Sequence, residues 1–154
     1  MTSHTTKVNH WSVRVYYEDT DHAGVVYYAN YLKFMERGRT EMLRHCGIEQ
    51  SSIQTQHGVV FAVTEANIRY FTPARFDDAL DVESQIQTLK GARLNFLQKI
   101  WRHETLLAEA TVNVACMDLN GKATRIPASI VAALQTQFQP KGSSQRFKPI
   151  PIEF

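Results

Sequence analysis

The sequence has few of the features that would take it out of the class of soluble globular proteins. Its 154 residues include two cysteines, Cys46 and Cys116, which are far apart and in no CxxC or metal-ligand spacing. They predict buried, reduced thiols and argue against a disulfide framework. No apolar run approaches the roughly 20 residues of a membrane-spanning helix, and residues 1–10 lack the apolar core of a secretory signal. We therefore expect a cytoplasmic protein without a membrane span.

The sequence also has no large excess of charge of either sign. Lys and Arg number 17 against 15 for Asp and Glu, which gives a net charge of +2. No basic run is interleaved with aromatic residues, and this argues against a nucleic-acid partner. The 6 histidines form no HxxxH or HxH pair, so we predict no metal site. No cofactor is expected either.

The length and composition of the chain predict one domain. Hydrophobic residues make up 44% of the chain and charged residues 21%, and a second domain would have to be very small. We assign residues 1–138 to this domain. Residues 139–154 form a tail of Pro, Gly, Ser and basic residues, a composition typical of mobile tails. The alternation of Ile150, Ile152 and Phe154 would also suit an extended strand docked on a neighbour.

Hydrophobic periodicity predicts a strand and then a long helix. Residues 11–18 alternate in the manner of a strand. From about residue 29 to 45, apolar residues recur every three or four positions, which indicates an amphipathic helix of about five turns that ends at Gly47. Gly38 lies on its apolar face and costs roughly 1 kcal/mol of helix propensity. This glycine therefore indicates close contact between the helix and a sheet.

After this helix we expect only strands until a last short helix. The strands are expected at 59–71, 79–89, 93–103 and 106–119, and the helix, which begins after Pro127, at about 128–137. The connections between these strands are too short for parallel crossovers. A long helix before an antiparallel meander predicts an α+β fold in which the helix covers the apolar face of the sheet.

The most informative segment is 16–31, which reads as a strand, a turn that bears carboxylates, a glycine and the start of the helix. A helix N-terminus offers unpaired N–H groups and about half a positive charge, which can stabilise a developing oxyanion. A carboxylate a few residues earlier could reach the same carbonyl carbon. This pairing favours acyl transfer over phosphoryl transfer, which would need glycine-rich phosphate loops or metal ligands.

Two other motifs that this segment partly matches are excluded. The spacing of Asp19, Asp21 and Gly24 matches the beginning of a calcium loop, but Ala23 stands at a ligand position and Asn30 stands where the bidentate Glu belongs. Ala23 also breaks the DxDx(T/V) pattern of haloacid-dehalogenase phosphatases. The chain lacks the βαβ repeats of that class.

The same segment closely resembles the signature of the 4-hydroxybenzoyl-CoA thioesterase-like hot-dog family. It is most similar to the branch associated with the Tol–Pal cell-envelope system. The resemblance continues through 34–44, 70–78 and 125–127 and covers about 12–134. It implies a hot-dog fold, an antiparallel five-stranded sheet wrapped around a long central helix. It also implies an acyl-CoA thioesterase with an acyl-CoA substrate, assembled as a homodimer or homotetramer.

The resemblance also implies a role for each residue of the motif. Asp21 matches the catalytic carboxylate, which acts as nucleophile or as general base, and the backbone N–H of Tyr28 matches the oxyanion donor. Many Tol–Pal relatives carry His at the position of Tyr28, so the acyl preference is left open. Gly24 is expected to serve backbone geometry and close approach of the substrate. We expect Asp19 to hold the loop by bonding turn amides, and His22 to lie at the surface or pocket rim.

Basic residues near the later turns are candidates for the CoA phosphates. Lys90 and Arg93 flank the turn at Gly91, in a region where family members commonly use basic residues. The alternative is that both are solvated turn charges.

Two further functions are known for this kind of fold. A dehydratase of hydroxyacyl thioesters would need a His base in a different loop pattern, and the Asp-Thr-Asp turn argues against it. The second is a non-catalytic adaptor or acyl-carrier-binding module of the cell-envelope machinery, with acyl carrier protein as a partner. Such a module has no evident need for Asp21 beside a helix end.

Overall fold

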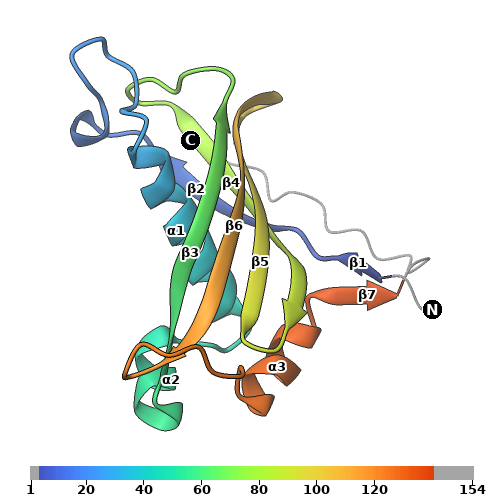
Figure 1. Cartoon of the computed structure of the whole chain (residues 1–154). Coiled ribbons are helices and arrows are strands. Elements are labelled where there is room, and N and C mark those ends of the chain that lie inside the picture. Colours follow the sequence, from blue (N-terminus) through green and yellow to red (C-terminus); the bar gives the residue numbers. More distant parts are fainter. Residues whose placement is uncertain (1–3, 141–154) are drawn as a thin grey trace.

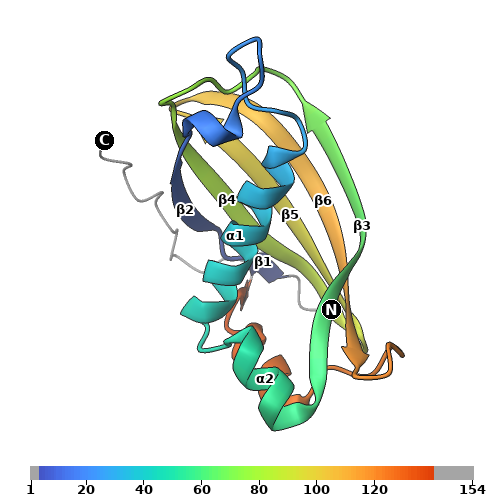
Figure 2. The same cartoon turned by 90° about the vertical axis from the view of Figure 1, so that its left-hand side faces the viewer.

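One long helix is wrapped by a five-stranded antiparallel sheet (Figures 1 and 2). The computed structural model describes residues 4–140, with side chains over 6–138. The strands lie in the order β2 (Asn9–Arg14), β4 (Ala79–Lys90), β5 (Arg93–Arg102), β6 (Thr105–Asp118) and β3 (Val59–Tyr70). The helix, α1 (Asn30–His45), packs on the inner face of this sheet. The predicted α+β architecture is confirmed.

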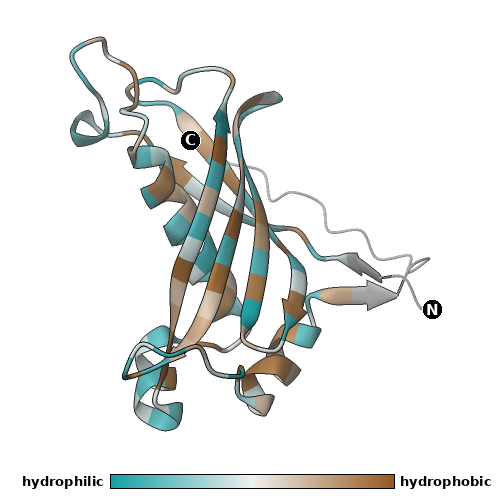
Figure 3. Ribbon diagram, viewed as in Figure 1, coloured by the Kyte–Doolittle hydropathy of each residue, from teal (hydrophilic) through white to brown (hydrophobic). Residues whose placement is uncertain are grey.

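Alternation along the strands places one set of side chains against the helix. Figure 3 shows apolar and polar residues alternating along the strands of the sheet. Phe96 of β5 and Val112 of β6 are paired in register and buried. They join Phe34 and Met35 of α1 in one core. An antiparallel sheet with one apolar face is stable only when that face is covered, and α1 provides the cover.

Gly38 permits the close approach of α1 to the sheet that the sequence indicated. A Cβ atom at this position would lie 2.7 Å from Val82 Cγ1 and 3.0 Å from Ser84 Oγ. Beside it, the buried Gln98 amide donates to the Met35 carbonyl at 2.8 Å and to Ser84 Oγ at 2.8 Å. Its carbonyl oxygen accepts from Arg39 at 2.9 Å. The polar groups at this contact are therefore paired, as burial requires.

The expected strand over 11–18 is too long. β2 ends at Arg14, and a 3-10 helix, η1 (Tyr17–Asp19), follows. The Asp19 carboxylate accepts a hydrogen bond from the Tyr16 N–H at 2.9 Å, which closes this turn. A local side-chain bond to the backbone has here replaced the strand pairing that the alternation predicted.

The expectation of strands alone after α1 was wrong, because a second helix, α2 (Gln50–His57), precedes β3. Its one buried residue is Ile53, so it carries no periodic signal that the sequence could show. The last helix, α3 (Ala128–Gln135), follows Pro127 as predicted.

A two-stranded sheet joins the ends of the described chain. β1 (His4–Thr6) pairs antiparallel with β7 (Phe138–Pro140). The pairing is continued by the Lys7 N–H, which donates to the Gln137 carbonyl at 2.7 Å. The assignment of residues 1–138 to the domain stays a prediction, and the expected docking of Ile150, Ile152 and Phe154 lies outside the described residues.

Candidate active site

The loop between β2 and α1 is fixed by the segment that connects β3 and β4. Val15 donates to the Asp78 carbonyl at 3.0 Å, and Asp77 donates back to the Val15 carbonyl at 3.0 Å. Further along the loop, Val26 donates to the Ala74 carbonyl at 2.8 Å. The Ala74 N–H in turn donates to the hydroxyl of Tyr31, a buried residue of α1, at 2.9 Å. The β3–β4 connection, which itself bonds to the helix, thus holds the loop at two points.

Asp19 holds the loop from the inside, as the sequence predicted. Its carboxylate is buried and accepts from Tyr16 N–H at 2.9 Å and from the side-chain amide of Asn30 at 3.1 Å. Its backbone carbonyl accepts from the Tyr27 N–H at 3.0 Å. Asp19 therefore connects η1, the returning side of the loop and the first residue of α1.

Asp21 has a different environment, because its side chain is exposed. Its N–H donates to the Val25 carbonyl at 2.9 Å, and Oδ1 accepts from the Ala23 N–H at 2.9 Å. Gly24 makes the turn with φ +77°, a conformation that favours glycine. Among residues 4–140, Oδ2 of Asp21 has no hydrogen-bond partner. One carboxylate oxygen is therefore held by the turn and the other is open to solvent.

The start of α1 offers unpaired N–H groups beside this loop. Asn30 donates to the Tyr27 carbonyl at 2.8 Å, and Leu32 donates to the Ala29 carbonyl at 3.2 Å. Within the described part of the chain, the N–H groups of Tyr28 and Ala29 have no acceptor. These two donors lie at the positive end of the helix dipole. Tyr28 lies just before the helix, as expected, and its side chain is 62% exposed.

Tyr70, at the end of β3, supports the helix start; it lies in the matched stretch 70–78, but no role was predicted for it. Its hydroxyl donates to the Tyr28 carbonyl at 2.9 Å, and its ring packs edge-on against Tyr28 and Tyr31 with centroid distances of 6.4 and 5.2 Å. Burial, with the neighbouring tyrosines as smaller causes, raises the pKa of Tyr70 above its ordinary value. The group therefore stays a neutral donor at physiological pH.

An aromatic surface surrounds the loop. Tyr17 and Phe76 stack with a centroid distance of 3.9 Å, although both rings are exposed. Seven aromatic residues of the loop and of the segment that supports it are exposed: Tyr16, Tyr17, Tyr27, Tyr28, Tyr70, Phe71 and Phe76. An exposed apolar patch of this kind is typical of a protein interface or a ligand-binding surface.

The cations proposed for CoA do not lie in this region. Lys90 and Arg93 pair across the β4–β5 turn, whereas β4 begins at Ala79, just after the segment that holds the loop. The 12 residues of β4 span roughly 40 Å, at about 3.3 Å per residue. A single chain thus brings together Asp21, Gly24 and Tyr28 but separates them from Lys90 and Arg93.

Among residues 4–140, no group of three His, Cys, Asp or Glu side chains could hold a metal ion. None of the helices described there is long and apolar enough to cross a membrane. Two hollows, of about 860 and 360 Å³, are lined by other parts of the chain and include neither Asp21 nor Tyr28.

Asn30 is a second residue of this region whose role the sequence did not predict. In the sequence it only breaks the calcium-loop pattern, whereas in the structure its buried amide pairs with Asp19 across the start of α1. A polar residue at the first turn of a predicted helix was the signal that could have indicated it.

Comparison with known proteins finds similarity to thioesterases. A family model described as the thioesterase-like superfamily matches residues 15–134. Among curated relatives, the acyl-CoA thioester hydrolase YbgC of Escherichia coli O6:H1 is 47% identical over 129 residues, which are 82% of this chain and 96% of the relative.

Solved structures show the same fold. The probable thioesterase from Bartonella henselae has a TM-score of 0.74 at 37% identity, covering 78% of this chain and 99% of that chain. A mutant 4-hydroxybenzoyl-CoA thioesterase complexed with 4-hydroxybenzoyl-CoA has a TM-score of 0.78 at 19% identity, covering 83% and 99%. The second likeness concerns the fold alone, and the expected hot-dog fold is confirmed.

Proposed function

This chain belongs to the thioesterase-like superfamily, and from this membership we propose that it hydrolyses an acyl-CoA to a free acid and CoA. One observation carries the proposal. An exposed carboxylate, Asp21, and two unpaired backbone donors, at Tyr28 and Ala29, occur on one loop at the start of α1. All three residues lie inside the matched range 15–134.

The helix start is the proposed oxyanion site. When the thioester carbonyl is attacked, its oxygen gains negative charge, which preorganised N–H donors stabilise strongly in a site shielded from water. The Tyr28 N–H is the proposed donor, and the dipole of α1 adds a favourable partial charge. Gly24 carries no side chain, so the acyl group can approach the loop closely at this point.

Asp21 is the proposed catalytic carboxylate, by one of two routes. As a general base it would take a proton from a water molecule that attacks the carbonyl carbon. As a nucleophile it would form a mixed anhydride, which water then hydrolyses. In both routes the C–S bond breaks, and CoA leaves as a thiolate that solvent protonates. The thiolate is a good leaving group, so neither route requires a dedicated strong acid.

The CoA phosphates are proposed to meet Lys90 and Arg93 of a second copy. Because these cations lie roughly 40 Å along β4 from the loop in one chain, a shared site requires a homodimer or homotetramer. The exposed aromatic surface around Asp21 and the free edge of β3 support such an assembly. The active site would then lie at the subunit interface.

The cellular setting belongs to the same proposal. We place the enzyme in the cytoplasm, in association with the Tol–Pal cell-envelope system, with acyl-CoA as substrate and acyl carrier protein as a candidate second partner. The resemblance of residues 16–31 to the Tol–Pal branch supports this setting.

The test is thiol release from a panel of acyl-CoAs, monitored with a colorimetric thiol reagent. Asp21→Asn keeps the shape of the side chain and removes its charge, so it should lower kcat by at least ~100-fold. Asp77→Asn is the matched control, because Asp77 is an exposed carboxylate on the neighbouring segment and its φ of +67° suits asparagine. Normal turnover by Asp21→Asn would overturn the mechanism. No thiol release from any acyl-CoA by the parent chain would favour the non-catalytic adaptor.

A further inference from the structure

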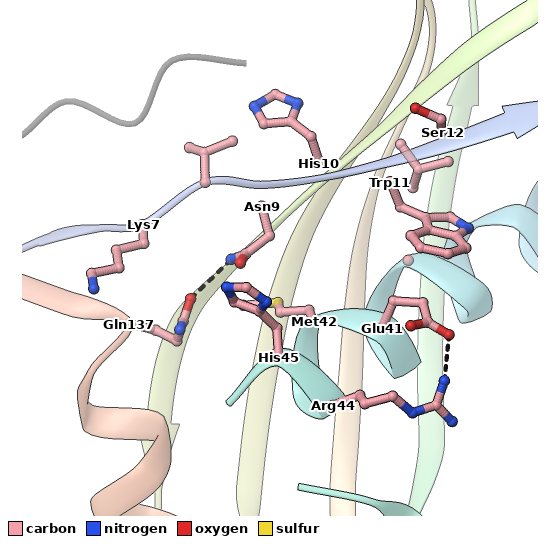
Figure 4. A pocket seen from close by; sticks show the side chains of 13 residues that line it. Lys7, Asn9, His10, Trp11, Ser12, Glu41, Met42, Arg44, His45 and Gln137 are labelled. Atoms are coloured by element: carbon pink, nitrogen blue, oxygen red, sulfur yellow. Dashed lines mark hydrogen bonds and ion pairs between the residues drawn. The ribbon is translucent and has the colours of Figure 1, made fainter. Parts of the chain in front are cut away.

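A hollow lies between β2 and α1 (Figure 4), on the opposite side of the helix from the edge strand β3 (Figure 2). It has a volume of about 860 Å³. Trp11 and Met42 point into it, whereas His10 and Ser12 point away from it. Its floor is formed by Gly38 and Val82 at the contact of α1 with the sheet. Trp11 is 39% exposed there, which is unusual for the largest apolar side chain.

The hollow opens at an unfinished edge of the sheet. β2 is the first strand in the order and pairs only with β4 among the described strands. Every second residue of such an edge strand directs its N–H and C=O away from the sheet. The chain returns to the start of β2, because β7 pairs with β1 and the Lys7 N–H, just before β2, donates to the Gln137 carbonyl. The described chain then ends at Pro140, opposite His4.

The sequence that follows has the pattern of a strand that can donate backbone hydrogen bonds from one of its two edges only. Residues 147–154 read Phe-Lys-Pro-Ile-Pro-Ile-Glu-Phe. In an extended strand Pro149 and Pro151 would direct their nitrogen atoms to the same edge, and neither has an N–H to donate. The N–H groups of Ile150 and Ile152 would point to the other edge, and their side chains would share one face with Phe154. Proline also biases the residue before it toward extended conformations.

We propose that residues 147–154 of the same chain form a sixth strand along the free edge of β2 and close this hollow. Ile150, Ile152 and Phe154 then cover Trp11 and Met42, and the two prolines face solvent, where they prevent any further strand from pairing.

The length of the chain suits this arrangement. Residues 141–146 contain Gly142, Ser143 and Ser144, which are typical of a reversal. The eight residues after them can span roughly 26–29 Å when extended. The lining strand segment, from Lys7 to Ser12, needs only about 20 Å for its six residues. The segment therefore reaches along the whole hollow without strain.

Trp11 is the natural reporter, because Trp101 is the only other tryptophan of the sequence. In a Trp101→Phe background, acrylamide quenching of Trp11 is compared between the full chain and a chain cut after Arg146. The cut should raise the quenching constant about twofold or more and shift the emission to longer wavelength. The reason is that it removes the segment proposed to cover the Trp11 ring, which is 39% exposed. Amide hydrogen exchange over β2 should become faster in the same sample.

Point variants locate the contact. Ile152→Asn should reproduce the effect of the cut, because it places an amide against Trp11. Glu153→Gln is the matched control, since in a strand its side chain points to the opposite face, and quenching should stay that of the parent. A synthetic peptide of residues 147–154 should restore protection to the shortened chain. Equal quenching in the full and shortened chains would overturn the proposal.

A dilution series separates the same chain from a second copy. Docking within one chain predicts protection of Trp11 that is constant with concentration. Two results together would assign the segment to a neighbouring copy and overturn the proposal in its stated form. Protection of Trp11 would fall on dilution, and the shortened chain would form a smaller oligomer than the full chain.

Discussion

Asn30 donates a hydrogen bond from its side-chain amide to Oδ1 of Asp19 at 3.1 Å, and both residues are buried. Asp19 belongs to the turn after β2, and Asn30 is the first residue of α1. The contact fixes the loop that carries Asp21 relative to the helix start that carries the unpaired N–H groups. The proposed carboxylate and the proposed oxyanion donor therefore depend on one buried side-chain pair.

Replacing Asn30 should disturb both stability and activity. Asn30→Ala leaves one oxygen of the Asp19 carboxylate buried without its partner, which should lower the free energy of unfolding by about 1–3 kcal/mol. We expect kcat to fall as well, because the loop loses its fixed position. Denaturant unfolding and thiol release measure the two effects. Asn67→Ala, at an exposed position of β3, should stay within about 0.5 kcal/mol of the parent; unchanged unfolding of Asn30→Ala would contradict the role of the pair.

Tyr28 should matter through its backbone rather than through its hydroxyl. Tyr28→Phe keeps the N–H, so kcat should fall by less than roughly tenfold, compared with at least ~100-fold for Asp21→Asn. Tyr16→Phe, an equally exposed tyrosine at 62%, controls for the loss of a surface hydroxyl. Both variants must first be shown to fold and assemble like the parent. A Tyr28→Phe enzyme as inactive as Asp21→Asn would refute the backbone assignment.

The His10–Asp81 pair should make stability depend on pH. His10 Nδ1 lies 2.7 Å from Asp81 Oδ2, and this hydrogen bond raises the pKa of His10 above 6.5, against the opposing effect of burial. A raised folded-state pKa stabilises the protein fully below the unfolded value of 6.5, and this stabilisation is lost as pH rises through the folded value.

The parent should therefore exceed His10→Gln in free energy of unfolding by more at pH 6 than at pH 9, by roughly 1 kcal/mol or more. Urea unfolding at the two pH values measures this difference. His22→Gln, at an exposed position of the loop, is the control for the loss of a histidine elsewhere. A difference between parent and His10→Gln that grows toward pH 9 would show that the charged pair does not stabilise the fold.

Lys90 and Arg93 should act on CoA binding from a second copy. Reversing both charges should raise KM for acyl-CoA with a smaller effect on kcat, because the residues contact phosphates and not the reacting carbonyl. Lys33→Glu, on the exposed side of α1, is the matched control. An unchanged KM would remove both cations from the site.

The proposed assembly has its own test. Light scattering that shows a fully active monomer at micromolar concentration would contradict it.

Much of the fold was determined by local patterns that the sequence displays openly. Apolar residues at three- and four-residue spacing predicted α1 to within a residue at its N-terminus, and runs of β-forming residues joined by short turns predicted β3 to β6. Gly38 indicated close contact with the sheet, since a glycine inside a long helix needs a compensating reason. The motif around Asp21 is likewise local in sequence, since it is a carboxylate turn before a helix, and the chemistry expected of it stays a prediction.

Two local features escaped the periodic signal. The strand predicted over 11–18 ends early because Asp19 bonds back to Tyr16, and α2 has only Ile53 to bury. Contacts between distant segments were decided by the tertiary structure alone. Tyr70 reaches the Tyr28 carbonyl across 42 positions of sequence. Such contacts depend on how strands pair in register, which no local pattern encodes.

The position of Lys90 and Arg93 shows the same division most clearly. The sequence identified two cations on a turn, which is a local property. Their distance from Asp21 depends on the direction and length of β4, which carries them to the far end of the sheet. Antiparallel pairing alternates the ends at which successive turns lie, so residue type alone could not decide which charges share a site.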